Sequence, residues 1–498
     1  MKLAPGFKNE QNKLLLLELG TLLVLAALTL WSVRALLEEW GLFAAFNVHG
    51  LSYLQQFANM IPLRPLHLIP TAMYWELMQG RTSGVAVGTL LVTVLRYLTV
   101  RWAVSPLFKG HDRWIVATMA AVLLAWPGAW LGRFAPAQFS ALLFFVALGC
   151  AIRLHQRWSV AAAAGAIVSI MMLLGSYQAL ALCLVALPLF ALLWSARNPS
   201  TPGLGLLAAH KAELRVALTI VLAFVLYGIY AVLVSRNSGG GYEADLAQSS
   251  GRLLTVAGLS AHIGAAYMTV YGTAPLMLPL MLVLAFYLQT GRTAVGGHGA
   301  SGLRAPLLTA ALVAALPLFS LIYLNAGHIT DPDRVLFPAS VAFVIVAISL
   351  LAWRHAAAAG SPDTGMPRAL VIVAALLLAA TVYAHHARQY ANVQRQVISQ
   401  AVVEIDARQP RSLLIQDATG TLGDVYTLLN PTLSQALAVH KRNVDATICT
   451  LSGVDRIHPD AQRYPISTTP RCEEVPAQPA PVLVLTARME NGILTLRP

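Results

Sequence analysis

Charged residues are scarce in this chain. Asp, Glu, Lys and Arg make up 11% of its 498 residues, whereas hydrophobic residues make up 57%. Soluble domains carry about 25% charged residues, so this composition excludes an ordinary soluble protein. The net charge of +12 does not indicate a nucleic-acid partner, because the basic residues lie singly between apolar segments and form no stripe. The composition is that of a polytopic membrane protein.

Motifs for nucleotide and serine-hydrolase chemistry are also missing. The chain has no P-loop of the form G-x-x-x-x-G-K-[ST] and no G-x-S-x-G motif. His49, His67, His262 and His328 lack the spacing of metal ligands, which argues against a zinc site. The sequence therefore predicts no cofactor and leaves a divalent metal as an open alternative. Any activated donor has to be something other than a cytosolic nucleotide.

Cysteine is rare, with four residues. Cys150 and Cys183 lie inside apolar segments and are expected to be small buried residues. Cys449 and Cys472 lie in the polar C-terminal tail. An extracytoplasmic tail meets an oxidising compartment, so we expect a Cys449–Cys472 disulfide; a cytoplasmic tail would leave two free thiols.

Long apolar stretches fill most of the first 390 residues. Lys and Arg cluster in every second connection between them, which places those connections and the N-terminus in the cytoplasm. An odd number of spans then puts the C-terminal region outside. Windows of about 20 apolar residues give about eleven candidate spans, near residues 14–37, 83–100, 114–131, 138–152, 159–177, 179–195, 216–235, 273–290, 305–324, 336–353 and 368–385.

The composition changes to that of a soluble domain after about residue 388. We therefore expect a transmembrane domain over residues 1–388, with an amphipathic first outer loop over 38–82, and an extracytoplasmic α/β domain over 389–498. The expected elements of the second domain are a strand over Leu413–Asp417, a helix over Val425–His440 and a hairpin of Val482–Thr486 with Ile493–Leu496.

The acidic pair in Glu38-Glu39-Trp40-Gly41 follows the first span. Ionisable groups near the hydrocarbon are costly, so this pair is a functional-site hypothesis. Adjacent helical residues point about 100° apart, so only one of the two enters a cleft. We favour Glu39, because Trp40 beside it marks the interface and Gly41 lets the chain turn away. The alternative is that both are interfacial acids that end a span.

Two arginines on the outer face are candidates for an anion clamp. Arg64 lies in Leu63-Arg64-Pro65-Leu66-His67, and Arg334 ends Asp331-Pro332-Asp333-Arg334. Guanidinium geometry suits phosphate recognition. The alternatives are that Arg64 is a surface arginine in a loop and that Arg334 belongs to a loop ion pair. Ser176-Tyr177-Gln178 lies at the outer junction of two spans, where a polar hairpin tip is an equally good explanation.

Taken together, these motifs resemble the GT-C superfamily of polytopic glycosyltransferases. The likeness lies in four short motifs within residues 10–385, and in their order and sidedness: Glu38-Glu39-Trp40-Gly41, Arg64-Pro65-Leu66, Ser176-Tyr177-Gln178 and Arg334-x-x-x-Pro338. Family members commonly carry an aspartate in the first motif, where this chain has two glutamates.

The resemblance implies a sugar transfer on the outer face of a bacterial inner membrane. The donor would be a polyprenyl-phosphate sugar, and the acceptor a glycan, lipid or protein. Glu39, or Glu38, would act as general base in an inverting reaction. Arg334 or Arg64 would stabilise the departing phosphate. The residues expected to bind substrate are Arg64, Arg334, His67, Tyr177, Gln178, Trp40 and Asp333.

Two other functions compete with this one. A transporter or flippase of lipid-linked sugars would need ionisable residues at mid-membrane, where Arg96 is the main example. An O-antigen polymerase or ligase would use Arg and His in a large outer loop, such as Arg236, Arg252 and His262.

Overall fold

Helices dominate the protein. The computed structural model describes residues 5–36, 38–108, 110–123, 134–195, 210–235, 255–272, 281–285, 301–324, 329, 332–357, 365–423, 428, 430–455 and 469–498, and the statements below concern these residues. The helical elements before the C-terminal domain are α1 (Pro5–Ser32), α2 (Glu38–His49), α3 (Ser52–Met60), α4 (Ile69–Leu77), α5 (Ser83–Ala103), α6 (His111–Leu123), α7 (Ala135–Gln156), α8 (Val160–Ser176), η1 (Gln178–Leu180), α9 (Ala181–Ser195), α11 (Lys211–Ser235), α13 (Val256–Tyr267), η2 (Met268–Gly272), α15 (Ser301–Ala314), η4 (Leu316–Ile322), α17 (Pro332–Ala357) and α18 (Gly365–Arg408).

The described helices agree with a helical membrane protein. Six of them are long and apolar enough to cross a bilayer, and each coincides with a predicted span: Asn12–Ser32, Ser83–Ala103, Ala135–Gln156, Lys211–Val234, Arg334–Ala352 and Met366–Arg408. Shorter apolar helices match three further predicted spans. The predicted span over 273–290 lies mostly outside the described residues. The count of eleven spans therefore stays a prediction.

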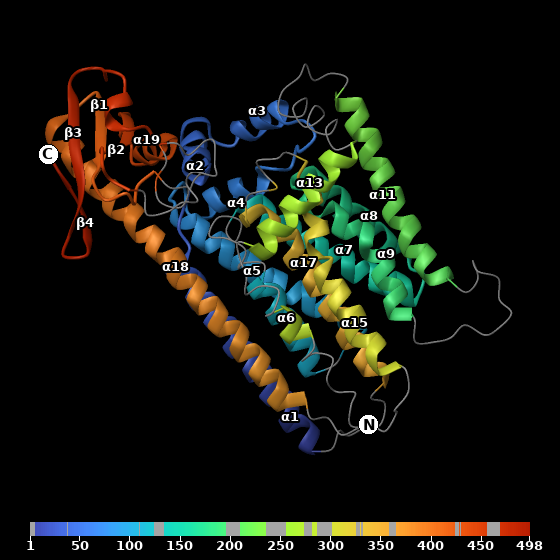
Figure 1. Cartoon of the computed structure of the whole chain (residues 1–498). Helices are drawn as coiled ribbons and strands as arrows, with labels where there is room; N and C mark the ends of the chain where they lie inside the picture. The colour runs from blue at the N-terminus through green and yellow to red at the C-terminus, as the bar shows by residue number, and fades with distance from the viewer. Residues whose placement is uncertain are drawn as a thin grey trace.

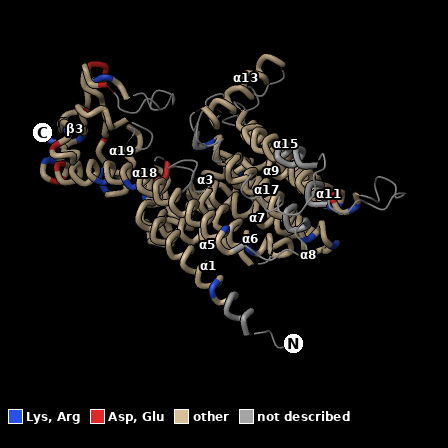
Figure 2. The backbone as a smooth tube through the Cα atoms, turned by 60° about the horizontal axis from the view of Figure 1, so that its bottom comes forward, with Lys and Arg blue, Asp and Glu red and all other residues tan. Residues whose placement is uncertain are grey.

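The helical body is built around α17, whose whole apolar window is buried. A helix that is apolar on every side has to be surrounded, and α6, α9 and η4 pack against it. At the edge of the body, α1 and α18 lie side by side (Figure 1) and expose large apolar side chains such as Leu23 and Leu378, as lipid-facing helices do. Charged residues gather at helix ends and in the C-terminal domain (Figure 2).

One helix joins the two parts of the chain. The 44 residues of α18 run from an apolar segment into the C-terminal domain, and residue 388, the predicted domain boundary, lies inside it. No Gly or Pro follows Pro367 before the helix ends, so nothing in the sequence interrupts it. At 1.5 Å per residue, the helix is about 65 Å long.

The C-terminal domain is a four-stranded sheet of order β2-β1-β3-β4, in which β1, β2 and β3 are parallel and β4 returns antiparallel to β3. The strand over Leu413–Asp417 and the hairpin are confirmed. The predicted helix begins later, since Leu428 lies outside it and residues 424–427 are outside the described part. The domain's elements are β1 (Ser412–Asp417), α19 (Asn430–Val439), β2 (Asp445–Thr450), η7 (Cys472–Glu474), β3 (Val482–Glu490) and β4 (Ile493–Arg497).

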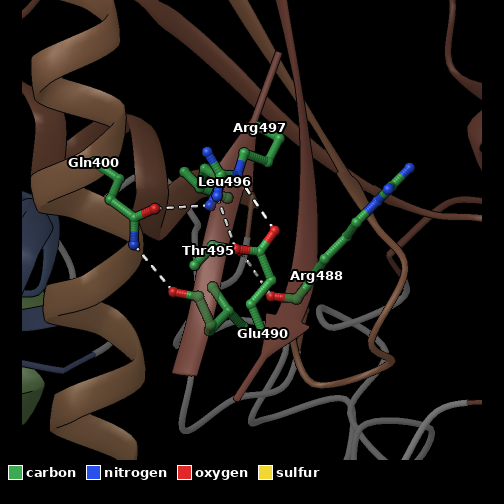
Figure 3. A network of polar contacts seen from close by, with 7 residues as sticks. Gln400, Arg488, Glu490, Thr495, Leu496 and Arg497 are labelled. Carbon is green, nitrogen blue, oxygen red and sulfur yellow. Dashed lines mark hydrogen bonds and ion pairs between the residues drawn. The ribbon is translucent and has the colours of Figure 1, made fainter. Parts of the chain in front are cut away.

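Two features hold this domain together. The predicted Cys449–Cys472 disulfide is present and ties β2 to η7. The side chain of Gln400 on α18 reaches the edge strand β4, where it donates to the Leu494 carbonyl at 3.0 Å and accepts from the Leu496 amide at 2.7 Å (Figure 3). This contact pairs backbone groups of an edge that would otherwise be open to another chain.

The first outer loop forms α2, α3 and α4, as its amphipathic pattern predicts. The helix α2 lies against α19 of the C-terminal domain, and the predicted position of the loop on the membrane surface stays a prediction. Gly41 does not turn the chain away, since it lies inside α2 and an added Cβ would stand 2.8 Å from the Gln435 side chain. Its lack of a side chain permits the close approach of α2 and α19.

Candidate functional site

The two glutamates occupy different surroundings. Glu39 is buried, with 3% of its surface exposed, whereas Glu38 is exposed. Both begin α2, so the 100° step between neighbours separates them. Glu39 Oε2 accepts a hydrogen bond of 2.8 Å from the Leu36 amide, which joins the carboxylate to the chain entering α2. Of the two acids, only Glu39 therefore faces the interior of the protein.

Tyr74 on α4 lies beside the Glu39 carboxylate. Burial raises the pKa of Tyr74, and the negative charge of Glu39 raises this pKa further. Arg96 on α5 is also within electrostatic reach of Tyr74. Arg96 is fully buried, donates to the Gln138 side chain, and donates to the Ala121 carbonyl at 3.2 Å. A carboxylate, a phenol and a guanidinium group thus form a buried polar series beneath the outer loop.

His67 is the centre of a second polar cluster. Its ring is 8% exposed, and Nδ1 lies 2.8 Å from the Ser176 carbonyl oxygen, so Nδ1 carries the hydrogen. Burial lowers the pKa of His67 to about 4; the bond to Ser176 opposes this shift, and the positive charges of Arg64 and Arg334 add to it. His67 is therefore neutral at pH 7. Both guanidinium groups are near enough to this ring to affect its pKa, so the two predicted clamp residues lie in the same region of the protein.

The loop that carries Arg64 is held at many points. The Leu66 amide donates to the Gly175 carbonyl at 2.9 Å. Tyr227 donates to the Leu63 carbonyl at 2.6 Å and receives a bond of 2.6 Å from Gln178. The R-P-L motif, the S-Y-Q junction and α11 thus support one another, and the loop presents its arginine from a rigid base.

Aromatic rings surround His67. Phe57 stacks on it with ring centroids 5.6 Å apart, and Tyr177 lies at 6.2 Å. The Tyr177 hydroxyl lies 3.2 Å from that of Tyr323. His262, a candidate of the polymerase hypothesis, is buried and bonds to the backbone of Tyr323. The aromatic shell excludes water from the histidine and so accounts for its neutral state.

The structure brings some predicted residues together and separates others. Arg64, Arg334, His67 and Tyr177 share the second cluster, and Gln178 is tied to it through Tyr227. Trp40 does not join them: its indole donates to Gln394 on α18 at 3.1 Å, and its ring lies near His440. Nothing is described of the Asp333 side chain, although its backbone lies in the first turn of α17.

The helix α4 connects the two clusters. It begins two residues after His67 and carries Tyr74 beside Glu39. Tyr74 lies seven residues after His67, so α4 joins the segments that carry the two clusters. A cavity of about 400 Å³ is lined by residues that include Trp40 but not Arg64, His67 or Arg334.

Sequence reasoning missed four candidate functional residues. Tyr74 gave no signal beyond an aromatic residue in an amphipathic segment. Gln138, the partner of Arg96, is a polar residue inside an apolar span, and that rarity was a usable signal. Arg388 and Arg395 line the cavity and lie seven residues apart on one helix, a spacing that places them on one face.

The arrangement of the described metal-binding residue types gives no support for a metal site. Within the described ranges, no three His, Cys, Asp or Glu residues come close enough to hold a metal ion. No model of a protein family matches the chain, and no curated protein matches it, so the resemblance to the GT-C superfamily remains a prediction.

Proposed function

We propose that this protein is an inverting glycosyltransferase that moves a sugar from a polyprenyl-phosphate donor to an acceptor hydroxyl at the outer membrane surface. The observation that carries the proposal is the packing of His67 against Tyr177 and of Tyr177 against Phe337, which brings the loop that carries Arg64 to the part of α17 that carries Arg334. The charges of both arginines lower the pKa of His67. Two positive charges on a rigid, partly buried base suit an anionic phosphate. The buried Glu39 supplies the carboxylate that the reaction needs.

The reaction divides between the two clusters. The Glu39 carboxylate accepts the proton of the acceptor hydroxyl while the oxygen of that hydroxyl attacks the anomeric carbon. The bond between that carbon and the phosphate oxygen breaks, and the lipid phosphate leaves with the bonding electrons. Arg64 and Arg334 stabilise the negative charge that develops on the leaving oxygen. Attack opposite the leaving group inverts the anomeric centre.

His67 contributes as a positioning residue. Since it is neutral, it adds no further positive charge between the arginines, and its bond to Ser176 orients the ring. Tyr177 and Phe57 hold the ring from either side and keep water away. The site is thus organised before the donor arrives, which lowers the reorganisation needed during the reaction.

The test is a turnover assay with the purified full chain. A synthetic polyprenyl-phosphate sugar is expected to release polyprenyl phosphate slowly and to transfer its sugar, with inversion, when an acceptor is present. Proteoliposomes distinguish the transporter function. Movement of an intact lipid-linked sugar across the bilayer, with no bond broken, would overturn the proposal.

A further inference from the structure

A basic cavity lies where α1 and α18 leave the apolar part of the molecule. Its volume is about 400 Å³, and three arginines line it: Arg34, Arg388 and Arg395. Trp40 and His440 close its side toward the C-terminal domain. None of the described residues lining it is acidic. A cavity with this lining has a strongly positive potential.

The arginines are close enough to affect one another. Burial lowers the pKa of Arg34, and the charges of Arg388 and Arg395 lower it further. Among the described residues, Arg388 donates one hydrogen bond, of 3.0 Å to the Trp31 carbonyl, and a guanidinium group has five N–H donors. Concentrating three like charges is unfavourable unless an anion balances them.

The position of the cavity relates it to the bilayer. Arg34 follows the last exposed apolar residues of α1, Leu30 and Trp31, which are 45% and 43% exposed. On α18, the exposed Leu378 and Val382 precede Arg388. The apolar faces of the two helices, which lie side by side (Figure 1), therefore lead directly to the arginines. Apolar chains lying along these faces would bring their headgroup to the cavity.

We propose that this cavity binds the phosphate of an anionic membrane lipid, whose acyl chains lie along α1 and α18. Charge complementarity selects the phosphate, and the continuous apolar faces select a lipid over a soluble anion. The site is separate from Arg64 and Arg334, and the inference stands whether or not the protein transfers sugar. A lipid here would hold the C-terminal domain against the membrane through Trp40 and α18.

Native mass spectrometry of the purified full chain tests the proposal. The probes are phosphatidylglycerol, which is anionic, phosphatidylcholine, which is zwitterionic, and glycerol phosphate, which has no acyl chains. The wild-type protein is expected to retain phosphatidylglycerol at least about tenfold better than phosphatidylcholine. Arg388→Gln with Arg395→Gln should reduce this preference about tenfold, because charge-assisted bonds are lost. Arg408→Gln, farther along α18 and paired with Glu404, is the matched control and should keep the preference.

Further variants keep the test independent of folding. Arg388→Lys with Arg395→Lys retains the charge, so an intermediate preference supports the proposal even where the glutamine variant melts at a lower temperature. An unchanged preference in the glutamine variant would overturn it. Displacement of the bound lipid by equimolar glycerol phosphate would also overturn it, since the site would then recognise a free anion.

Discussion

The helical body and the C-terminal sheet domain differ in how many of their charged side chains they bury: among the described residues, Asp417 is the one charged side chain buried in the sheet domain. In the helical body, Glu39, His67 and Arg96 are buried among aromatic and apolar residues. In the sheet domain, ion pairs such as Arg497 with Glu490, at 2.8 Å, lie at the surface (Figure 3). Surface pairs contribute little to stability, whereas buried polar groups are expensive and are kept for a purpose. Under the proposed function, we expect the buried groups of the helical body to take part in the reaction and the sheet domain to give structural support.

We therefore expect substitutions of the buried groups in the helical body to change turnover, and substitutions in the sheet domain to change stability.

Loss of either clamp arginine should have a large effect on turnover. Arg64→Gln and Arg334→Gln are each expected to lower kcat about 10²- to 10³-fold, because each removes a charge that stabilises the departing phosphate. The measurement is the release of polyprenyl phosphate under saturating donor. Arg81→Gln, an exposed arginine in the same outer loop, is the control and should keep wild-type turnover. A clamp variant with normal kcat would contradict the assignment.

Removal of the disulfide should affect stability alone. Cys449 and Cys472 are 23 positions apart, and closing a loop of this length stabilises a domain by about 3 kcal/mol. Cys449→Ser with Cys472→Ser should lower the unfolding free energy of the sheet domain by about that amount and leave turnover unchanged. Denaturant unfolding measures the first and the donor assay the second. A reductant should destabilise the wild type and have no effect on the variant.

His67 should make stability depend on pH. Its folded-state pKa is about 4 and its ordinary value is 6.5, so between these values the unfolded chain binds more protons. Unfolding free energy therefore falls as pH falls through this window, by on the order of 3 kcal/mol in total. His67→Gln cannot take up the proton, so its stability should vary less with pH from 6.5 to 4. His49→Gln, at an exposed position, should retain the wild-type dependence.

The edge contact of Gln400 should have the smallest effect. Gln400→Leu removes two hydrogen bonds to β4 and is expected to lower the stability of the sheet domain by about 1–2 kcal/mol. Gln396→Leu makes the same change one helical turn earlier and serves as the control. Equal losses in both variants would show that the contact with β4 is not what stabilises the domain.

Local patterns account for the parts of the fold that the sequence predicted. Apolar windows gave the six long membrane helices, and alternation around Asn491-Gly492 gave the hairpin. Both residues have positive φ, as such a turn requires. The strand β2 was missed because its alternation is short and its partner β1 lies far away in the sequence.

Individual residues of the candidate site could be predicted from the sequence, but which of them lie close together could not. The acidic pair and the two arginines stood out because charge is rare in this chain. Arg64 and Arg334 both affect His67 electrostatically because distant segments of the chain pack together. The spacing of residues in the sequence does not reveal that packing. The position of Trp40 against α18 and the C-terminal domain depends on the same long-range packing, and its role in binding substrate stays a prediction.

The most direct test compares the two glutamates, which are neighbours in sequence and differ in burial. Glu39→Gln keeps the shape of the side chain and removes the base, so kcat for sugar transfer should fall about 10²- to 10⁴-fold. Glu38→Gln should retain turnover close to that of the wild type. Full turnover in Glu39→Gln, with both variants folded, would contradict the account.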